Sequence, residues 1–487
     1  MLLRTHIDAG SYKQYIFPLL FFKRMCDVWD EENELAVVIY GEEGKTFEET
    51  HRFKIPDGFH WKDVRNVTVD VGMAISDAFR EIEKANDKKL RGIFSGSTWT
   101  NKNRLPDRLL KDLIEHFSTL TLSLANCPED ELGQGYEYLV RKFADDSGHT
   151  AQEFYTNRTV VHLMTEILDP QEQEAIYDPT CGSAGMLISA VAYLREHGRE
   201  WINARLYGQE INTLTSAIGR MNMFLHGISD FHIVNDDTLA RPAFIENGSL
   251  QRFDIVLANP PYSIRQWNRK AFETDKYGRN IYGVPPQGRA DYAFIQHVIA
   301  NLKPDTGRCA ILLPHGVLFR AEESAIRENL VKSDKIEYII GLAPNLFYNS
   351  PMEACIMICR MDKNPEHRGH ILFVNAVDLV ERSGVQSWLN YGHRWVIAKT
   401  CKNYQTQEGF SRAVSIEEIA ENNYSLNIAL YVRPPADSKK DTRSLEECIS
   451  EWDMESTLMC AEYRELKRML EGRRVDLWRD TDSMRLL

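Results

Sequence analysis

Apolar positions recur at two different spacings along this chain, and the change in spacing divides it. Up to about residue 148 they recur every three or four positions, which predicts helices; examples are Tyr15, Leu19, Phe22, Met25, Met73, Ile75, Phe79 and Ile82. From residue 149 to about 400, short apolar runs alternate with helical patterns. That alternation predicts an α/β fold with a doubly wound, mostly parallel sheet. We therefore expect a helical N-terminal domain at 1–148 and an α/β domain at 149–432.

The last part of the chain, 433–487, is predicted to be a linker followed by a helical tail. Residues 434–440 combine prolines with Ser and Lys, which is typical of a linker. Beyond it, apolar residues recur with helical spacing at Leu445, Ile449, Trp452, Leu458, Leu466 and Met469. Such an amphipathic helix packs either on its own domain or on another subunit.

The apolar run 253–258 predicts a buried strand, and it ends in a rigid turn, Asn259-Pro260-Pro261-Tyr262. The Asn259 amide oxygen and the adjoining backbone can accept the two N–H bonds of an exocyclic amine, and Tyr262 can stack on its ring. The turn resembles that of the amino-methyltransferases, which act on adenine N6, on cytosine N4 or on a glutamine amide. An ordinary turn after a strand is the alternative interpretation.

A second motif, at 175–188, reads as a strand, a small-residue loop and the start of a helix. It lacks the dinucleotide fingerprint and a phosphate-binding Lys, which argues against a bound nucleotide phosphate. It resembles motif I of the S-adenosylmethionine-dependent DNA methyltransferases. The resemblance implies that Asp178 lies near the methionine ammonium, with the loop against the cofactor through Thr180, Gly182, Ser183 and Gly185.

Acidic residues follow the next two predicted strands. Glu210 ends the strand at 205–210, about 20–25 residues beyond the glycine loop, where doubly wound folds bind ribose hydroxyls. Asp236 and Asp237 follow the third strand, where an acidic side chain would meet the adenine amino group of the cofactor. The sequence does not choose between them. Asp236 is slightly preferred, because Asp237 also fits a cap of the following turn.

The segment 152–164 resembles the Gly-Glu-Phe-Tyr-Thr-Pro segment of the modification subunits of type I restriction–modification systems. Further matches at 8–24, 288–297, 307–319, 342–348 and 355–358 extend the likeness over roughly residues 5–435. In that family the segment forms a wall of the methionine pocket, here through Glu153, Phe154, Tyr155 and Thr156. Gln152 and Asn157 replace the usual Gly and Pro, and Asn157 is expected to cap the helix that follows. A helix that often precedes this region is missing, so we expect a short or truncated N-terminus.

The net charge of −13 argues against a protein that grips DNA over its whole surface. Between Asp30 and Glu49 there are eight acidic residues and one Lys. The balance reverses in the aromatic-bearing segment 263–289, whose basic residues are Arg265, Arg269, Lys270, Lys276, Arg279 and Arg289. Beside the Asn259–Tyr262 turn, these residues are candidates for contacts with DNA around a flipped base. A mobile solvated loop is the alternative.

The family resemblance implies a function. The protein would transfer a methyl group from S-adenosylmethionine to adenine N6 in double-stranded DNA, with the adenine flipped out. Asn at the first turn position favours adenine over cytosine, for which Ser is more usual. A separate specificity subunit would choose the sequence, with two modification subunits bound to it and a restriction/translocase subunit in the full complex. The C-terminal tail would dock on the specificity subunit. A protein-glutamine methyltransferase and a non-catalytic cofactor-binding scaffold remain as alternatives.

Other features restrict the setting. No run of about 18 apolar residues and no signal peptide is evident, so neither a membrane nor export is expected. The nine cysteines are scattered without a CxxC pair, which indicates a reducing cytoplasm and no metal site. Cys355 and Cys359 are predicted to be buried thiols.

Overall fold

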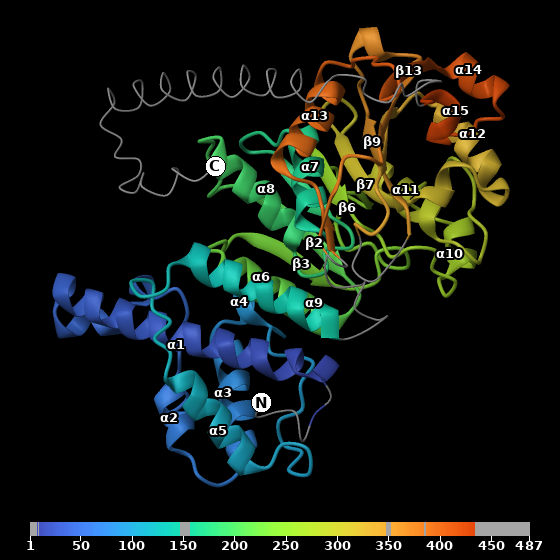
Figure 1. Ribbon diagram of the computed structural model, residues 1–487. Helices are drawn as coiled ribbons and strands as arrows, with labels where there is room; N and C mark the ends of the chain where they lie inside the picture. Colours follow the sequence, from blue (N-terminus) through green and yellow to red (C-terminus); the bar gives the residue numbers. More distant parts are fainter. Residues whose placement is uncertain (1–6, 8, 147–155, 347–351, 384–385, 434–487) are drawn as a thin grey trace, which may run out of the picture. The chain divides into compact units, whose positions relative to one another are not determined.

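The structure is a computed structural model that describes residues 7, 9–146, 156–346, 352–383 and 386–433. The chain divides into two compact units, Met1–Arg433 and Pro434–Leu487. The second unit lies outside the described residues, and with it the predicted linker and tail helix. The first unit is shown in Figure 1.

The N-terminal part is helical, as the three-to-four spacing predicts. Its helices are α1 (Lys13–Tyr40), α2 (Trp61–Asn66), α3 (Val71–Ala85), α4 (Asp87–Leu90), α5 (Asp107–Ser118) and α6 (Glu129–Asp146). The apolar residues whose spacing predicts α1 and α3 are buried, except Met73, which is 51% exposed. Val71 and Ala78 complete the buried face of α3 together with Ile75, Phe79 and Ile82. The predicted helix is confirmed, and Met73 lies on it outside the buried stripe that these five residues form.

One face of α1 also holds the segment 122–127 that leads into α6. Arg24 is buried, and its Nη1 donates to three carbonyls of this segment at 2.6–2.8 Å. Asp27 and Glu31, three and seven positions further along the same helix, accept backbone N–H bonds from residues 122, 124 and 125. Polar groups on α1 thus replace the hydrogen bonds that this irregular segment would otherwise make with water.

The α/β part is built on a nine-stranded sheet with the order β13-β10-β8-β9-β7-β6-β1-β2-β3. Five neighbouring pairs are parallel, and the three that involve β9 or β13 are antiparallel. The predicted doubly wound, mostly parallel sheet is confirmed. The strands of this sheet are β1 (Ala175–Asp178), β2 (Arg205–Glu210), β3 (Phe231–Asn235), β6 (Ile255–Ala258), β7 (Arg308–Pro314), β8 (Ile336–Leu342), β9 (Ala354–Arg360), β10 (His370–Ala376) and β13 (Ser411–Ser415).

Two short hairpins lie outside this sheet, β4 (Ile245–Glu246) with β5 (Ser249–Leu250) and β11 (Glu381–Ser383) with β12 (Gln386–Trp388). The helices of the α/β part are α7 (Arg158–Leu168), α8 (Gly185–Glu196), α9 (Thr213–Leu225), α10 (Arg269–Glu273), α11 (Asp291–Ala300), α12 (Ser324–Lys332), α13 (Tyr391–Lys402), α14 (Ile416–Glu421) and α15 (Ile428–Tyr431).

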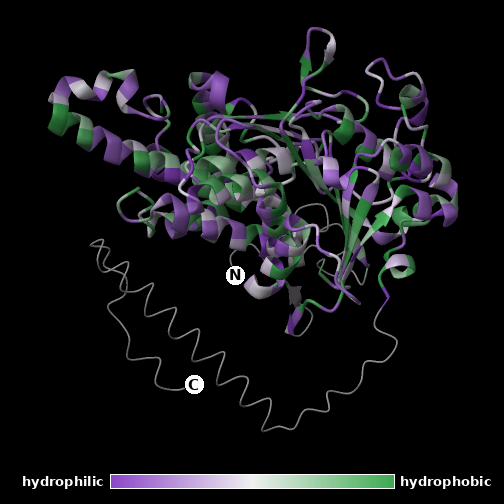
Figure 2. Ribbon diagram, turned by 90° about the horizontal axis from the view of Figure 1, so that it is seen from above, coloured by the Kyte–Doolittle hydropathy of each residue, from purple (hydrophilic) through white to green (hydrophobic). Residues whose placement is uncertain are grey.

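Helices cover both faces of the sheet. Residues of α7, α8 and α13 share one apolar core with it, and residues of α11, α12, α14 and α15 share another. Figure 2 shows hydrophobic residues on strands as well as on helices. β6 through β9 are buried on both faces, as expected where helices cover a sheet on both sides. Cys355 and Cys359 of β9 are buried thiols, as predicted.

α9 belongs to two cores. Its Ile218, Met221 and Leu225 pack into the core of the N-terminal helices, and its Met223 packs into the core on the sheet. Arg220, also on α9, donates to the carbonyls of residues 89 and 91 at 2.8 and 2.7 Å. The N-terminal helices therefore share their core with α9, a helix of the α/β part. The domain boundary near residue 148 stays a prediction.

The predicted cap at the start of α7 is confirmed. Asn157 accepts a hydrogen bond from the Thr159 backbone N–H at 3.0 Å, at the position where the resembled segment has proline. Its Nδ2 donates to the carbonyls of Leu346 and Ser387 at 3.1 and 2.9 Å. The substitution therefore preserves the helix start and adds two contacts that a proline could not make.

Replacing the buried Arg24 tests the role of α1. We expect Arg24→Met to lower the free energy of unfolding by roughly 2–4 kcal/mol, because three carbonyls lose a charged donor. Urea denaturation of the purified chain would measure the change. The control is Arg80→Met, since the Arg80 side chain is 65% exposed on α3. Equal stabilities of the two variants would contradict this role for Arg24.

Candidate active site

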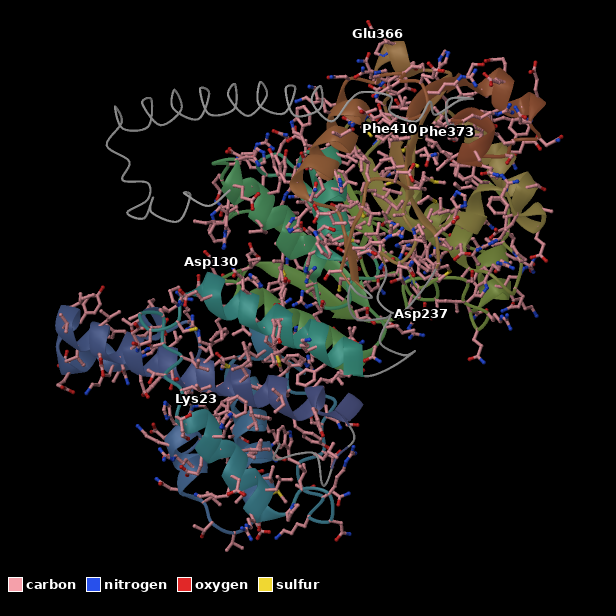
Figure 3. All side chains as sticks on the ribbon, viewed as in Figure 1. Lys23, Asp130, Asp237, Glu366, Phe373 and Phe410 are labelled. Atoms are coloured by element: carbon pink, nitrogen blue, oxygen red, sulfur yellow. The ribbon has the colours of Figure 1, made fainter. Side chains whose placement is uncertain are left out.

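A cavity of about 730 Å³ opens where β1, β2 and β6 end. Asp237, which follows β3, lies in its wall and is labelled at the lower edge of the sheet in Figure 3. Of the predicted residues, the cavity is lined by Thr156, Asp178, Thr180, Gly182, Ser183, Gly185, Glu210, Asp237, Asn259, Pro260, Pro261 and Tyr262. Residues from motifs as much as 106 positions apart in the sequence thus share one space.

Two carboxylates organise the glycine loop after β1. Glu210 at the end of β2 accepts the Gly182 N–H at 3.1 Å and the Asn212 N–H at 2.8 Å. Asp178 at the end of β1 is 2% exposed and accepts the Thr180 N–H at 3.0 Å. Burial, with a smaller contribution from the Glu210 charge, raises the pKa of Asp178 to about 8. A cation entering the cavity would reverse this effect.

The loop also rests on α9. Asn222 donates from Nδ2 to the Ser183 carbonyl at 2.9 Å. A Cβ at Gly219 would lie 2.6 Å from the Gly182 carbonyl oxygen, so only glycine lets helix and loop approach this closely. The loop is therefore fixed by Glu210 from the sheet and by α9 from the helical side.

The turn after β6 faces the same cavity. Asn259 donates from Nδ2 to the Thr156 hydroxyl at 2.9 Å, so its amide oxygen is the group directed to other partners. Tyr262 is half-buried, and enclosure of its hydroxyl raises the pKa of the phenol. An amide oxygen, a proline-fixed backbone and an aromatic side chain thus line one space, as the sequence predicts.

Buried charges anchor the end of this turn. Ser263 has a φ of +53°, and its N–H donates to Asp291 Oδ1 at 2.7 Å. Arg320 donates from Nη1 to Asp291 Oδ2 at 2.7 Å and to Glu323 Oε2 at 3.4 Å. Asp291 is 1% exposed and Glu323 fully buried. This link between α11 and the turn stabilises a left-handed conformation that residues other than glycine rarely adopt.

The two acidic residues after β3 have different surroundings. Asp236 pairs with Arg241, with Oδ1 2.5 Å from Nη2, and this pair lowers the pKa of Asp236. Asp237 accepts the N–H groups of Leu239 and Ala240 at 2.9 and 3.0 Å, as expected of a cap. Only Asp237 lies in the cavity wall. The geometry therefore favours Asp237, against the slight preference for Asp236 that the sequence suggested.

Of the six basic residues predicted to face DNA, three are exposed, two lie near an acidic side chain and one, Arg279, is buried. Arg265, Lys270 and Lys276 are exposed. Arg269 pairs with Glu273, and Arg289 lies 3.8 Å from Glu322.

Arg279 does not fit the predicted role in DNA binding. Only 3% of its side chain is exposed, and it pairs with Asp275 at 2.6 Å. It also donates to the carbonyls of Thr238 and Leu239 at 3.1 and 2.9 Å. Arg279 thus connects its own loop to the segment after β3, and its charge is used inside the protein.

The sequence reasoning missed three residues of the site, Arg158, Asp291 and Arg320. Arg158 lies in the segment 152–164, two positions after Thr156, and lines the cavity. The contact of Asp291 and Arg320 with the turn could not be predicted from the sequence, because these residues lie 28 and 57 positions beyond Ser263. Glu153, Phe154 and Tyr155 lie outside the described residues.

Among the residues that the structure describes, no three His, Cys, Asp or Glu side chains are grouped as metal ligands. Of the helices within the described ranges, none is both long and apolar enough to span a membrane.

Comparison with known proteins gives matches over most of the chain. Residues 128–440 match the family model for N-6 DNA methylases, and residues 1–117 match that for the HsdM N-terminal domain. A type I restriction enzyme HindI methylase subunit from Haemophilus influenzae is 30% identical over 74% of this chain and 83% of its own length. A type I restriction enzyme MjaVIII methylase subunit from Methanocaldococcus jannaschii is 30% identical over 89% and 76%.

Solved structures agree. The type I restriction-modification system methyltransferase subunit from Streptococcus thermophilus superposes with a TM-score of 0.76, at 29% identity over 88% of this chain and 97% of that one. A modification subunit of a putative type I restriction enzyme from Vibrio vulnificus has the same fold, with a TM-score of 0.63 and 20% identity.

The buried cluster behind the turn generates a pH prediction. Burial, together with the nearby Asp291 charge, raises the pKa of Glu323 to about 7, against 4.5 in an unfolded chain. The folded state therefore keeps a proton that the unfolded state has lost between about pH 4.5 and 7, and stability falls as pH rises through this window. Glu323→Gln has no carboxyl group to titrate at this position. As pH rises across the window, the free energy of unfolding of the variant should therefore increase relative to that of the parent, by at most about 1.4 kcal/mol per pH unit.

Thermal and urea unfolding at pH 5, 6 and 7 would measure the effect. The control is Glu328→Gln, because Glu328 lies on α12 and is 39% exposed beside Lys332. A stability difference between Glu323→Gln and the parent that does not change with pH would contradict the prediction.

Proposed function

Because the chain belongs to the N-6 DNA methylase family, we propose that its cavity binds S-adenosylmethionine and that the Asn259–Tyr262 turn presents an adenine of DNA to the methyl group. The observation that carries this proposal is that Asn259, Asp178 and Glu210, from three different strand ends, line a single cavity. One half of the cavity is acidic and glycine-rich, and the other is the amine-binding turn.

The residues of the cavity fit this cofactor. Asp178, buried and with a raised pKa, would hold the methionine ammonium. Glu210 accepts two backbone N–H groups, and a carboxylate has further lone pairs for the ribose hydroxyls. Asp237, rather than Asp236, would meet the adenine amino group. Glu153, Phe154 and Tyr155 remain proposed wall residues beside Thr156.

Catalysis would consist of positioning. When bound, S-adenosylmethionine supplies a methyl group already activated by its sulfonium, so no covalent nucleophile is needed. The Asn259 oxygen and the backbone next to Pro260 and Pro261 would accept the two N–H bonds of the target amine. Orientation of this kind contributes up to roughly 7–11 kcal/mol, and acceptors aimed at the amine stabilise the charge that develops on it. Stacking on Tyr262 would replace on the order of 1–3 kcal/mol lost when the base leaves the duplex.

DNA would approach over the exposed residues Arg265, Lys270 and Lys276, with a weaker contribution from Arg269 and Arg289. The chain has a net charge of −13, and phosphate neutralisation dominates affinity for DNA. We therefore infer that a specificity subunit supplies much of the affinity and the choice of sequence. Two modification subunits bound to one specificity subunit, a restriction subunit and a cytoplasmic setting complete the proposal.

Replacing Asn259 tests the assignment of the turn. We expect Asn259→Ala to lower methyl transfer to DNA about 100-fold or more, because the amine loses an acceptor present in the transition state. Transfer of radiolabelled methyl by the reconstituted complex would measure it, and Asn203→Ala, at an exposed position, is the control. Mass spectrometry of the product separates methyladenine from the methylglutamine of the alternative enzyme. Undiminished transfer by Asn259→Ala would remove Asn259 from the mechanism.

Replacing Asp178 tests the acidic, glycine-rich half of the cavity, which is proposed to bind the cofactor. The ammonium of the cofactor would favour ionised Asp178 and lower its pKa from about 8. Binding should then release a proton below pH 8, and affinity should rise with pH between about 6 and 8 and level off above. Titration calorimetry with S-adenosylhomocysteine, in two buffers of different ionisation enthalpy, measures the number of protons released on binding. Asp178→Asn should bind weakly and without proton release, whereas proton uptake by the parent protein would contradict the assignment.

A further inference from the structure

Arg158 occupies a defined place in the wall of the cavity. It is the first residue of α7, two positions after Thr156. The capping bonds of Asn157 fix the chain at this point. Among the described residues that line the cavity, Arg158 is the single lysine or arginine. Its side chain is 17% exposed, so its charge is largely withdrawn from water.

Two neighbours set the position of its guanidinium. Glu137 on α6 accepts hydrogen bonds from Nε at 2.9 Å and from Nη2 at 2.5 Å. Nη1 lies over Gly185, the first residue of α8, where an ideal Cβ would be only 1.5 Å from it. The Arg158 guanidinium therefore fills the space above Gly185, and any side chain at position 185 would displace it.

The wall of the cavity carries charges of both signs, as an amino acid group requires. Asp178 and Glu210 supply negative charge at the ends of β1 and β2. Arg158 supplies positive charge over Gly185, the first residue of the helix that follows the loop. A zwitterionic amino acid group needs both signs close together, and a guanidinium is the side chain best matched to a carboxylate.

We propose that Arg158 binds the carboxylate of the methionine part of the cofactor; this rests on the proposed function. Glu137 orients the guanidinium through Nε and Nη2, and Nη1 is the atom placed over the loop. Gly185 is needed because it leaves room for the guanidinium, in addition to any contact of its own with the cofactor. The methionine end of the cavity is thereby tied to α6.

Two ligands separate this role from a purely structural one. S-adenosylhomocysteine carries the amino acid carboxylate, and 5′-methylthioadenosine lacks the amino acid group. Arg158→Ala should weaken binding of S-adenosylhomocysteine by about 10- to 100-fold and change that of methylthioadenosine less than about twofold. Calorimetry on the purified full chain measures both affinities, and circular dichroism reports folding. Gly185→Ala, which displaces the guanidinium, should also bind S-adenosylhomocysteine more weakly.

The matched control is Arg199→Ala, since Arg199 pairs with Asp169 at 2.7 Å but does not line the cavity. It should leave both affinities unchanged. If Arg158→Ala loses affinity for both ligands equally, or for neither, the inference is overturned while the proposed function stands. If the parent protein fails to bind S-adenosylhomocysteine, the cofactor assignment fails, and the inference fails with it.

Discussion

The parallel register of β6, β1 and β2 is the constraint on which the site depends. Asp178 lies opposite Gly208 on β2, and Tyr177 lies opposite Val256 on β6. Parallel strands end at one edge, so their last residues and the turns beyond them meet there. A slip of one residue in β1 would turn Asp178 to the other face of the sheet and shift the glycine loop away from Glu210 on β2. The double layer of helices that buries these strands prevents such a slip.

Elements whose determinants are local could be predicted from the sequence. Strand runs, helix periodicity and the Asn157 cap each depend on a few neighbouring residues, and the structure confirms them. The membership in the N-6 DNA methylase family was also predictable, because the Asn259–Tyr262 turn and the glycine loop are compact motifs. Helical spacing does not say which apolar residues are buried, since Met73 of α3 is 51% exposed.

The parts that escaped prediction depend on charges brought together by the fold. Arg279 reads as one more basic residue of an exposed loop, yet its partners include Asp275 and carbonyls about 40 positions away. The roles of Asp291 and Arg320 likewise depend on where Ser263 ends up in space. Asp236 pairs with Arg241, whereas Asp237 lies in the wall of the cavity, and neither contact is visible in the sequence. Charge in a sequence does not say whether water or protein will satisfy it.

α9 has a consequence for how force passes through the molecule. It packs into the core of the N-terminal helices through Ile218 and Met221, while Gly219 and Asn222 of the same helix contact the glycine loop. Interiors at crystal-like density transmit displacement instead of absorbing it. A partner that shifts the N-terminal helices must therefore either break this packing or move the loop. Through α9, the packing of the N-terminal helices is thus coupled to the backbone of residues 182 and 183.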